Sequence, residues 1–290
     1  MTRRLSIDTL HIGSAQPLTV IGGMCVLESP ETNEEVGLAM RDACCELGMN
    51  FIYKASFDKA NRSSVHSPRG PGLEAGLEEL ARLRDRLGVP VSTDIHEPDQ
   101  APAAADAVDL LQIPAFLCRQ TDLLCAAAKT GRAVNVKKGQ FMAPGEMQRA
   151  VDKLEECGGQ EIMLTERGTF FGYHRLVNDF IGLGDLMELG RPVCFDVTHS
   201  TQLPGAGATT TAGRPERATL LARAAVAAGV DALFIECHTQ PDQAASDAST
   251  ALSLEAACDL LRAAAAIRRA IESEPSTPDS TFEPLAGRNI

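Results

Sequence analysis

Eight short runs of apolar and β-branched residues alternate along the chain with longer stretches of helical period. The runs are residues 18–28, 50–55, 89–95, 108–113, 133–138, 161–166, 192–198 and 230–236. Alternating strands and helices are typical of βα units around a parallel sheet, and nearly continuous apolar runs indicate strands covered on both faces. Eight such units in about 260 residues predict an α/β fold, a closed (β/α)8 TIM barrel rather than an open sheet.

The segments outside these runs predict the rest of the architecture. Residues 213–229 and 250–271 are rich in Ala and Leu, which are strong helix formers, and we expect the last two barrel helices there. Residues 4–16 precede the first run and predict a β-hairpin that closes the barrel floor. Residues 272–290 are rich in Ser, Thr, Pro and acidic residues, so we expect a disordered or loosely docked tail after a single catalytic domain of residues 1–271. One helix has an apolar face marked by leucines at three- and four-residue steps, namely Leu73, Leu77, Leu80, Leu83 and Leu87.

Charge and composition exclude several classes of partner. The 290 residues carry a formal net charge of −12, which argues against a nucleic-acid surface because phosphate backbones are held by excess Lys and Arg. No apolar run approaches the roughly 20 residues that a membrane helix needs, and the first residues are too polar for a signal peptide. A cytoplasmic protein that binds neither nucleic acid nor membrane is therefore expected.

The 9 cysteines are odd in number and scattered over a long chain, unlike the disulfide framework of a secreted protein. We expect reduced thiols, with a metal ligand possible among them. Apart from Cys25, they fall mostly in apolar or helical surroundings and are expected to fill the core: Cys44, Cys45, Cys118, Cys125, Cys157, Cys194, Cys237 and Cys258.

Cations accumulate at the ends of the predicted strands, where a TIM barrel carries its active site. They are Lys54, Lys59, Arg62, Arg69, Lys137, Lys138 and Arg167. A basic mouth in an acidic protein favours a small anionic substrate, and a mixture of Arg and Lys suits phosphate together with carboxylate. Some of these cations could instead pair with nearby acids such as Asp58 or Glu166.

Four possible metal ligands also lie at strand ends. Cys25, His199 and Glu236 end the first, seventh and eighth runs, which are neighbours in a closed barrel, and Asp247 follows in the next loop. A thiolate, an imidazole and two carboxylates suit Zn²⁺, Fe²⁺, Mn²⁺ or Co²⁺ better than Mg²⁺ or Ca²⁺. Cys25 taken alone also fits a buried core thiol, and His238 could replace or support one of the ligands.

Long motifs in matching order resemble those of the 3-deoxy-manno-octulosonate-8-phosphate synthases. They are GGMCVLES, KASFDKANRSS, SPRGPGLE, TDIHEP, QIPAFLCRQTDL, NVKKGQF, ERGTFFGY, FDVTHS, FIECH and SDAST, spread over about residues 20 to 255. The resemblance implies a TIM-barrel homotetramer without an organic cofactor. It also implies a divalent metal, because metal-dependent members of this family carry Cys at the position of Cys25 and metal-independent members carry Asn.

The resemblance assigns roles to individual residues. It implies that the metal is held by Cys25, His199, Glu236 and Asp247. Lys54, Lys59, Lys137 and Arg167 are expected to contact phosphoenolpyruvate, with Gln112 and Ala115 lining its site. Asp94, at the end of the third run, is a further candidate substrate-binding residue. The loop from Lys59 to Ser64 is similar to the arabinose 5-phosphate loop, with Asn61 toward the sugar, Arg62 and Ser63 on its phosphate, and the site completed across a subunit boundary. Candidate proton-transfer groups are Lys137, His199 and Asp247.

The implied reaction joins phosphoenolpyruvate, D-arabinose 5-phosphate and water into 3-deoxy-D-manno-octulosonate 8-phosphate and inorganic phosphate, a step toward lipopolysaccharide. One alternative is the sister enzyme that uses erythrose 4-phosphate to make 3-deoxy-arabino-heptulosonate 7-phosphate. The KANRSS loop argues against it, since that family usually carries a shorter Lys-Pro-Arg-Thr-like loop. A second alternative is a non-catalytic barrel that binds a sugar phosphate, which would leave the joint presence of anion sites and metal ligands unexplained.

Overall fold

The computed structural model describes residues 3–61, 66–205 and 212–273. Eight parallel strands form a closed barrel, in which each strand pairs with the next and the last pairs with both the first and the seventh. The TIM barrel predicted from the alternating pattern is confirmed. The strands are β3 (Thr19–Gly23), β4 (Asn50–Lys54), β5 (Val91–Asp94), β6 (Leu110–Ile113), β7 (Ala133–Lys137), β8 (Ile162–Glu166), β9 (Val193–Asp196) and β12 (Ala232–His238).

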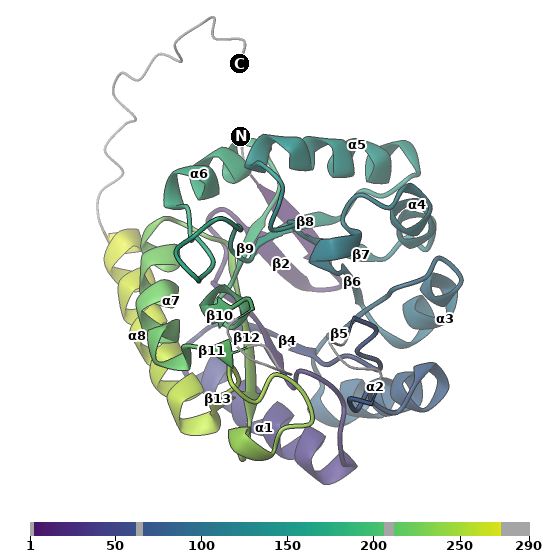
Figure 1. Cartoon of the computed structure of the whole chain (residues 1–290), viewed down its shortest axis with the longest axis horizontal. Coiled ribbons are helices and arrows are strands. Elements are labelled where there is room, and N and C mark those ends of the chain that lie inside the picture. Colours follow the sequence, from purple (N-terminus) through teal and green to yellow (C-terminus); the bar gives the residue numbers. More distant parts are fainter. Residues whose placement is uncertain (1–2, 62–65, 206–211, 274–290) are drawn as a thin grey trace, which may run out of the picture.

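Within the described residues, eight α-helices form a ring around the barrel (Figure 1). They are α1 (Pro30–Glu46), α2 (Leu73–Leu87), α3 (Gln100–Ala107), α4 (Thr121–Lys129), α5 (Gln148–Glu156), α6 (Phe180–Glu188), α7 (Ala218–Ala227) and α8 (Leu254–Ser273). The Ser29 side chain caps α1 by accepting from the Thr32 N–H, and Gly88 ends α2 in the left-handed conformation. The predicted leucine face of α2 is buried at Leu77, Leu80, Leu83 and Leu87.

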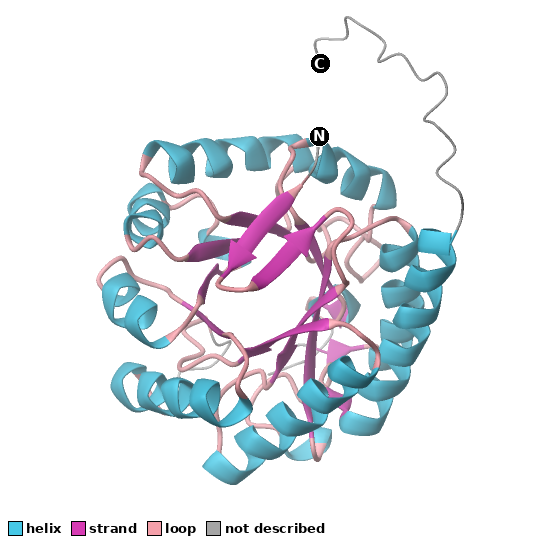
Figure 2. Ribbon diagram, turned by 180° about the vertical axis from the view of Figure 1, so that it is seen from behind, coloured by secondary structure: helices cyan, strands magenta, loops and turns pink. Residues whose placement is uncertain are grey.

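The predicted N-terminal hairpin is present as the antiparallel pair β1 (Arg4–Ile7) and β2 (Leu10–Gly13). Figure 2 shows it lying across one end of the barrel. Leu5, Ile7 and Ile12 are buried in one cluster with interior barrel residues such as Ile21 and Phe234. Each fully buried Leu or Ile contributes roughly 1.5–3 kcal/mol, so the hairpin stabilises this end and closes it. The hairpin does not cover the opposite end of the barrel, at the carboxyl termini of the strands, which is where TIM barrels carry their active sites.

Three short strands lie beyond the carboxyl ends of the barrel strands: β10 (Gln202–Leu203), β11 (Ala212–Gly213) and β13 (Leu252–Ser253). The first two pair with each other, and β13 adds in parallel to the end of β12 at Cys237 and His238. No α-helix in the described ranges is both long enough and apolar enough to cross a membrane.

Among the predicted boundaries that differ from the structure, two concern the first strand and the tail. The first run was predicted to extend to residue 28, but β3 ends at Gly23, which has φ +154° and lies so close to the Lys54 carbonyl that a Cβ would clash with it. Residues 24–27 therefore form a buried loop that carries Cys25. The tail was predicted to begin at residue 272, but α8 continues to Ser273, and residues 274–290 lie outside the described residues.

The prediction that all thiols are reduced is wrong for one pair. Cys125 on α4 and Cys157 at the end of α5 form a disulfide, with Cα atoms 5.2 Å apart. The two helices pack side by side, which brings cysteines 32 positions apart in sequence within bonding range. Among the described free cysteines, five are buried as expected, Cys258 is half-buried and Cys45 is exposed.

Candidate active site

Polar and charged side chains are buried at the carboxyl ends of the barrel strands. Burying charge is costly unless partners or ligands compensate, so such a group of side chains at the usual place of TIM-barrel chemistry marks the candidate active site. The buried members are Lys54, Asp94, Gln112, Lys137, Glu166, Arg167, Asp196, His199 and Glu236.

Three of the four predicted metal ligands form one compact group. Ligand atoms of Cys25, Glu236 and Asp247 all lie within 4.8 Å of one another. The fourth, His199, places Nε2 3.5 Å from Glu236 Oε2 and 3.4 Å from Asp247 Oδ2. Cys25 lies in the loop after β3, His199 in the turn after β9, Glu236 on strand β12 and Asp247 in the loop before β13. The pairing of β12 with both β3 and β9 brings these segments together, as the sequence predicted.

The Glu236 carboxylate has the properties of an unused ligand. It is 1% exposed, and neither of its oxygens has a hydrogen-bond partner among the described residues. Burial raises its pKa, but His199, Lys59 and Lys54 outweigh that effect and lower the pKa below the ordinary value. A buried anion with both oxygens available for further interaction fits the binding of a cation.

His199 is oriented by Asp196. Its Nδ1 lies 2.8 Å from Asp196 Oδ2, and its backbone N–H donates to Oδ1 over 2.9 Å. Because Nδ1 faces a carboxylate, the neutral ring carries its proton there and leaves the Nε2 lone pair toward Glu236 and Asp247. A carboxylate behind a histidine is the usual arrangement around metal-binding imidazoles. Asp196 ends the seventh barrel strand, and no role was predicted for it, although its place three residues before His199 was a usable signal.

Cys25 completes the donor set. Its Sγ lies 3.1 Å from Ser246 Oγ and 3.4 Å from Asp247 Oδ2. Burial, and then the charge of Glu236, raise the pKa of the thiol well above its ordinary value. The thiolate therefore needs a bound cation to form, and a site with sulfur, nitrogen and oxygen donors fits a divalent transition metal or zinc.

Three buried cations, Lys137, Arg167 and Lys54, lie beside this donor set. Lys137 Nζ is 2.6 Å from Asp196 Oδ2 and 3.6 Å from the centre of the Phe234 ring. Arg167 donates from Nη2 to Gln202 over 2.7 Å, while its buried Nη1 has no hydrogen-bond partner in the described part of the chain. Burial lowers the pKa of both Lys137 and Arg167, and nearby carboxylates oppose that shift. A bound anion would satisfy the unused Arg167 donor.

Lys54 and Asp94 form the third part of the site. Lys54 Nζ donates to Ser56 over 2.9 Å and lies 3.3 Å from Asp94 Oδ1. Burial raises the pKa of Asp94, but Lys54 and His96 outweigh it and hold that pKa well below the usual range. Asp94 is therefore an anion that orients Lys54. Gln112, the residue before the last of β6, has a buried Oε1 without a hydrogen-bond partner among the described residues.

The remaining predicted substrate residues lie around this centre. Ala115 begins the short helix after β6 and is buried. Burial lowers the pKa of Lys59, but Cys25, Glu236 and other nearby acids outweigh it and raise the pKa, so this cation lies within electrostatic reach of the donor set. Asn61 is exposed at the edge of the described chain, and Arg62 and Ser63 lie outside the described residues.

Two cations of the predicted basic mouth pair with the acids named as alternatives in the sequence, Asp58 and Glu166. Arg69 forms an ion pair with Asp58, and Lys138 lies 3.4 Å from Glu166 and donates to the Met142 carbonyl. These pairs match the alternative that some cations simply neutralise neighbouring acids. His238 is not part of the compact donor group either, because its Nε2 lies 3.4 Å from Glu28.

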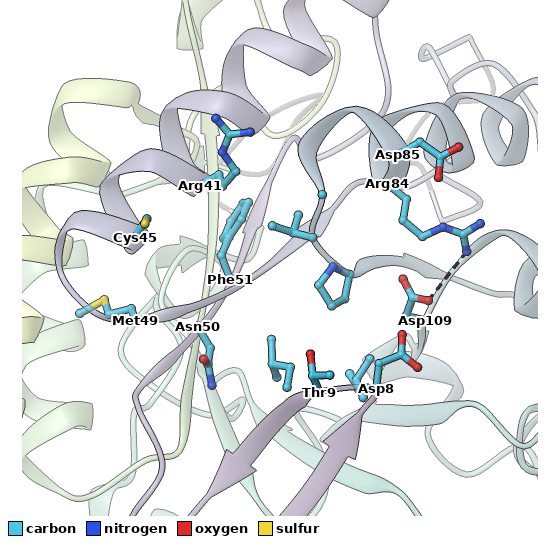
Figure 3. A pocket seen from close by; sticks show the side chains of 15 residues that line it. Asp8, Thr9, Arg41, Cys45, Met49, Asn50, Phe51, Arg84, Asp85 and Asp109 are labelled. Atoms are coloured by element: carbon cyan, nitrogen blue, oxygen red, sulfur yellow. Dashed lines mark ion pairs between the residues drawn. The ribbon is translucent and has the colours of Figure 1, made fainter.

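A cavity of about 780 Å³ lies at the other end of the barrel, between the hairpin tip and the ends of α1 and α2 (Figure 3). Its charged lining includes Arg84, which lies 3.8 Å from Asp109, and Arg41, which donates to the Leu87 carbonyl. This end of a TIM barrel serves stability, and the buried polar side chains described above gather at the opposite end. The cavity is therefore not the candidate active site.

Comparison with known proteins agrees with this geometry. Residues 4–272 match the DAHP synthetase I family. A protein of Cyanothece sp. named 2-dehydro-3-deoxyphosphooctonate aldolase is 53% identical over 262 residues, covering 90% of this chain and 96% of the relative. Proteins of the same name from Synechococcus sp. and Desulfotalea psychrophila are 51% and 49% identical over 268 and 261 residues. These matches cover 92% and 90% of this chain, and 94% and 93% of the respective relatives.

Proposed function

The chain belongs to the DAHP synthetase I family, and we propose that it catalyses the reaction of a 2-dehydro-3-deoxyphosphooctonate aldolase. It is a carbon–carbon bond-forming transferase that condenses phosphoenolpyruvate with D-arabinose 5-phosphate and water. The products are 3-deoxy-D-manno-octulosonate 8-phosphate and inorganic phosphate. The observation that carries the proposal is the buried cation set of Lys54, Lys137 and Arg167 directly beside the donor group that contains Cys25.

Phosphoenolpyruvate is the proposed ligand of the three buried cations. It carries a phosphate and a carboxylate, and the planar fork of Arg167 together with the compact charges of Lys54 and Lys137 suits such a pair of anions. The unused Arg167 Nη1 supports this assignment, because it is a buried donor that lacks a partner among the described residues. Gln112 is proposed to line the same site. Asp94 acts by holding Lys54, and Ala115 lines the site.

Arabinose 5-phosphate is proposed to bind at the loop that begins at Lys59. Asn61 would face the sugar and Arg62 and Ser63 its phosphate, as the family resemblance implies. We also propose a homotetramer in which a neighbouring subunit completes this phosphate site. Exposed apolar side chains near the ends of β6 to β8 and at the start of α6 support assembly. They are Phe116, Phe141, Phe171, Tyr173, Val177 and Ile181.

A divalent metal, Zn²⁺, Fe²⁺, Mn²⁺ or Co²⁺, is proposed to be held by Cys25, His199, Glu236 and Asp247. The donor set and the unpartnered oxygens of Glu236 support this part of the proposal. When bound, the metal supplies a Lewis acid that polarises an aldehyde or a water molecule. No organic cofactor is proposed, in keeping with the family resemblance.

The residues of the chain account for the charge movements of the reaction. The enol carbon of phosphoenolpyruvate attacks the aldehyde carbon, and water adds to the positive carbon that results. The hemiketal phosphate then expels inorganic phosphate. Lys54, Lys137 and Arg167 are placed to stabilise the negative charge that develops on the phosphate. Proposed proton-transfer groups are Lys137, His199 and Asp247.

We place this reaction in the cytoplasm, where phosphorylated metabolites are available, as a step that supplies a lipopolysaccharide precursor. The sister reaction with erythrose 4-phosphate uses the same kind of anion site. The names of the relatives compared above and the KANRSS loop favour arabinose 5-phosphate over erythrose 4-phosphate.

The test is phosphate release from phosphoenolpyruvate in the presence of either aldose. We expect release with arabinose 5-phosphate and little with erythrose 4-phosphate. Release with erythrose 4-phosphate alone would support the sister enzyme, and no release with either would support a binding protein. Arg167→Met should abolish release, whereas Arg84→Met, which removes a cation at the opposite end of the barrel, should leave it unchanged.

A further inference from the structure

The loop from residue 239 to residue 251 joins β12 to β13 and carries Asp247. Asp247 has φ +49°, a conformation that residues other than glycine seldom adopt without support from their surroundings. Backbone hydrogen bonds such as Thr250 N–H to the Asp247 carbonyl join residues within the loop. These bonds hold the shape of the turn but not its position against the barrel. Contacts to the rest of the protein are needed to keep Asp247 beside Cys25 and His199.

Two side chains link this loop to the barrel. His238, the last residue of β12, accepts at Nδ1 from the backbone N–H of Gln240 over 2.9 Å. Its Nε2 lies 3.4 Å from Oε2 of Glu28, which follows β3, within ion-pair range but without a hydrogen bond among the described residues. The other oxygen of Glu28 accepts from the backbone N–H of Ala245 over 2.9 Å. The chain of contacts thus grips the loop at two backbone amides, one of them two residues before Asp247.

Glu28 is itself firmly held. Its backbone N–H donates to Oδ1 of Asn33 over 3.0 Å, and Asn33 Nδ2 reaches the Glu28 carbonyl at 3.4 Å. Asn33 is fully buried on α1 and donates to Glu79 on α2 over 3.0 Å. The grip on the loop is therefore anchored in the first two helices of the barrel.

We propose that Glu28 and His238 are positioning residues that clamp the 239–251 loop and so hold Asp247 at the metal-binding group. The inference rests on the proposed function, because it takes Asp247 as a metal ligand. His238 then supports the metal centre from outside it, rather than replacing one of the four ligands. Partners that orient ligands typically change metal affinity by about 10–100-fold when they are removed.

The experiment is a titration of metal-free full-length protein with Co²⁺, followed by its affinity and its visible absorption, together with kcat and KM. Glu28→Ala and His238→Ala should each weaken Co²⁺ binding by about tenfold or more and change the absorption, because the Asp247 oxygen is no longer held in the coordination shell. The double variant should be little weaker than either single one, since both act through one clamp. Gln243→Ala, an exposed change on the same loop, should match the wild type.

Conservative variants separate the clamp from a merely local role of the histidine. His238→Asn keeps an acceptor for the Gln240 N–H but is too short to reach Glu28, so it should bind Co²⁺ as weakly as His238→Ala. Glu28→Gln keeps an acceptor for the Ala245 N–H and should restore part of the affinity lost in Glu28→Ala. Because these two changes are small, they test the clamp even if the alanine variants fail to fold.

The outcomes distinguish failure of the clamp from failure of the proposed function. A wild-type protein that binds no Co²⁺ would contradict the metal centre itself. Wild-type affinity and absorption in Glu28→Ala and His238→Asn, with tight binding in the wild type, would overturn the clamp and leave the metal centre intact. Full rescue by His238→Asn alone would also overturn it, since the histidine would then only cap a turn.

Discussion

His199 and Asp196 are joined twice, because the ring Nδ1 and the backbone N–H of His199 both contact the same carboxylate, at 2.8 and 2.9 Å. The oxygen that faces the ring also lies 2.6 Å from Lys137 Nζ. Burial raises the pKa of Asp196, but His199 and Lys137 outweigh it and lower the pKa far below the usual range. Asp196 therefore stays an anion that connects the candidate metal centre to the candidate phosphoenolpyruvate site.

Asp196→Asn is predicted to damage both halves of the site. A neutral amide favours the proton on His199 Nδ1 less strongly than the carboxylate does. Part of the ring population then carries its proton on Nε2, which cannot bind a metal in that form, and Lys137 loses its countercharge. We expect metal affinity to fall by about 10–100-fold and kcat to fall with it. Metal titration and phosphate-release kinetics measure the two effects.

Asp109→Asn is the matched control, since Asp109 is a buried aspartate at the opposite end of the barrel, where it accepts from the Val91 N–H. It should lower stability without changing metal affinity. Equal metal affinity in Asp196→Asn and the wild type would show that Asp196 does not orient the ligand.

The second prediction concerns alkaline pH. Burial lowers the pKa of Lys137, and although Asp196 opposes the shift, the ammonium is lost at a lower pH than that of an exposed lysine. If the charged form holds the substrate, kcat/KM falls as pH rises through this pKa. Arginine stays protonated, so Lys137→Arg should move the alkaline limb of kcat/KM to higher pH, whatever its effect on the maximum. If the alkaline limb of kcat/KM stays at the same pH in Lys137→Arg, the limb belongs to another group.

The disulfide gives a prediction about stability. Because it closes a loop of 32 positions between α4 and α5, its loss should lower the free energy of unfolding by roughly 2–4 kcal/mol. Urea unfolding of Cys157→Ser, or of the wild type with reductant, should show this loss with kcat unchanged, since both cysteines lie on the outer helices. Cys258→Ser removes a half-buried free thiol and serves as the control. The same urea midpoint with and without reductant would mean that the bond does not form in solution.

Much of the fold followed from periodicity, because covered parallel strands and amphipathic helices leave distinct patterns. The leucines of α2 and the apolar runs of β6 and β8 were readable for this reason. The end of β3 could not be predicted from periodicity, since it depends on the close approach of Gly23 to the Lys54 carbonyl, a contact between different strands. The disulfide was missed for the same reason, as only helix packing brings Cys125 to Cys157.

The candidate site was predictable as far as strand order determines it. Cys25, His199 and Glu236 lie near or just beyond the carboxyl ends of neighbouring strands, so closure of the barrel was enough to bring them together. Apart from His238, which the sequence offered as a replacement or a support for a ligand, the supporting residues were not predicted, because their roles depend on side-chain directions. Asp196 and Glu28 look in sequence like ordinary acidic residues after strands, and only their contacts with His199 and His238 distinguish them.

The central claim is that this barrel condenses its two substrates with a divalent metal held by Cys25 and its three neighbouring ligands. The most direct measurement is phosphate release from phosphoenolpyruvate and arabinose 5-phosphate by protein of known metal content, before chelation, after chelation and after metal is returned. The account predicts a bound metal in fresh protein, loss of activity with the metal, and recovery on its return. Full activity in metal-free protein would contradict it.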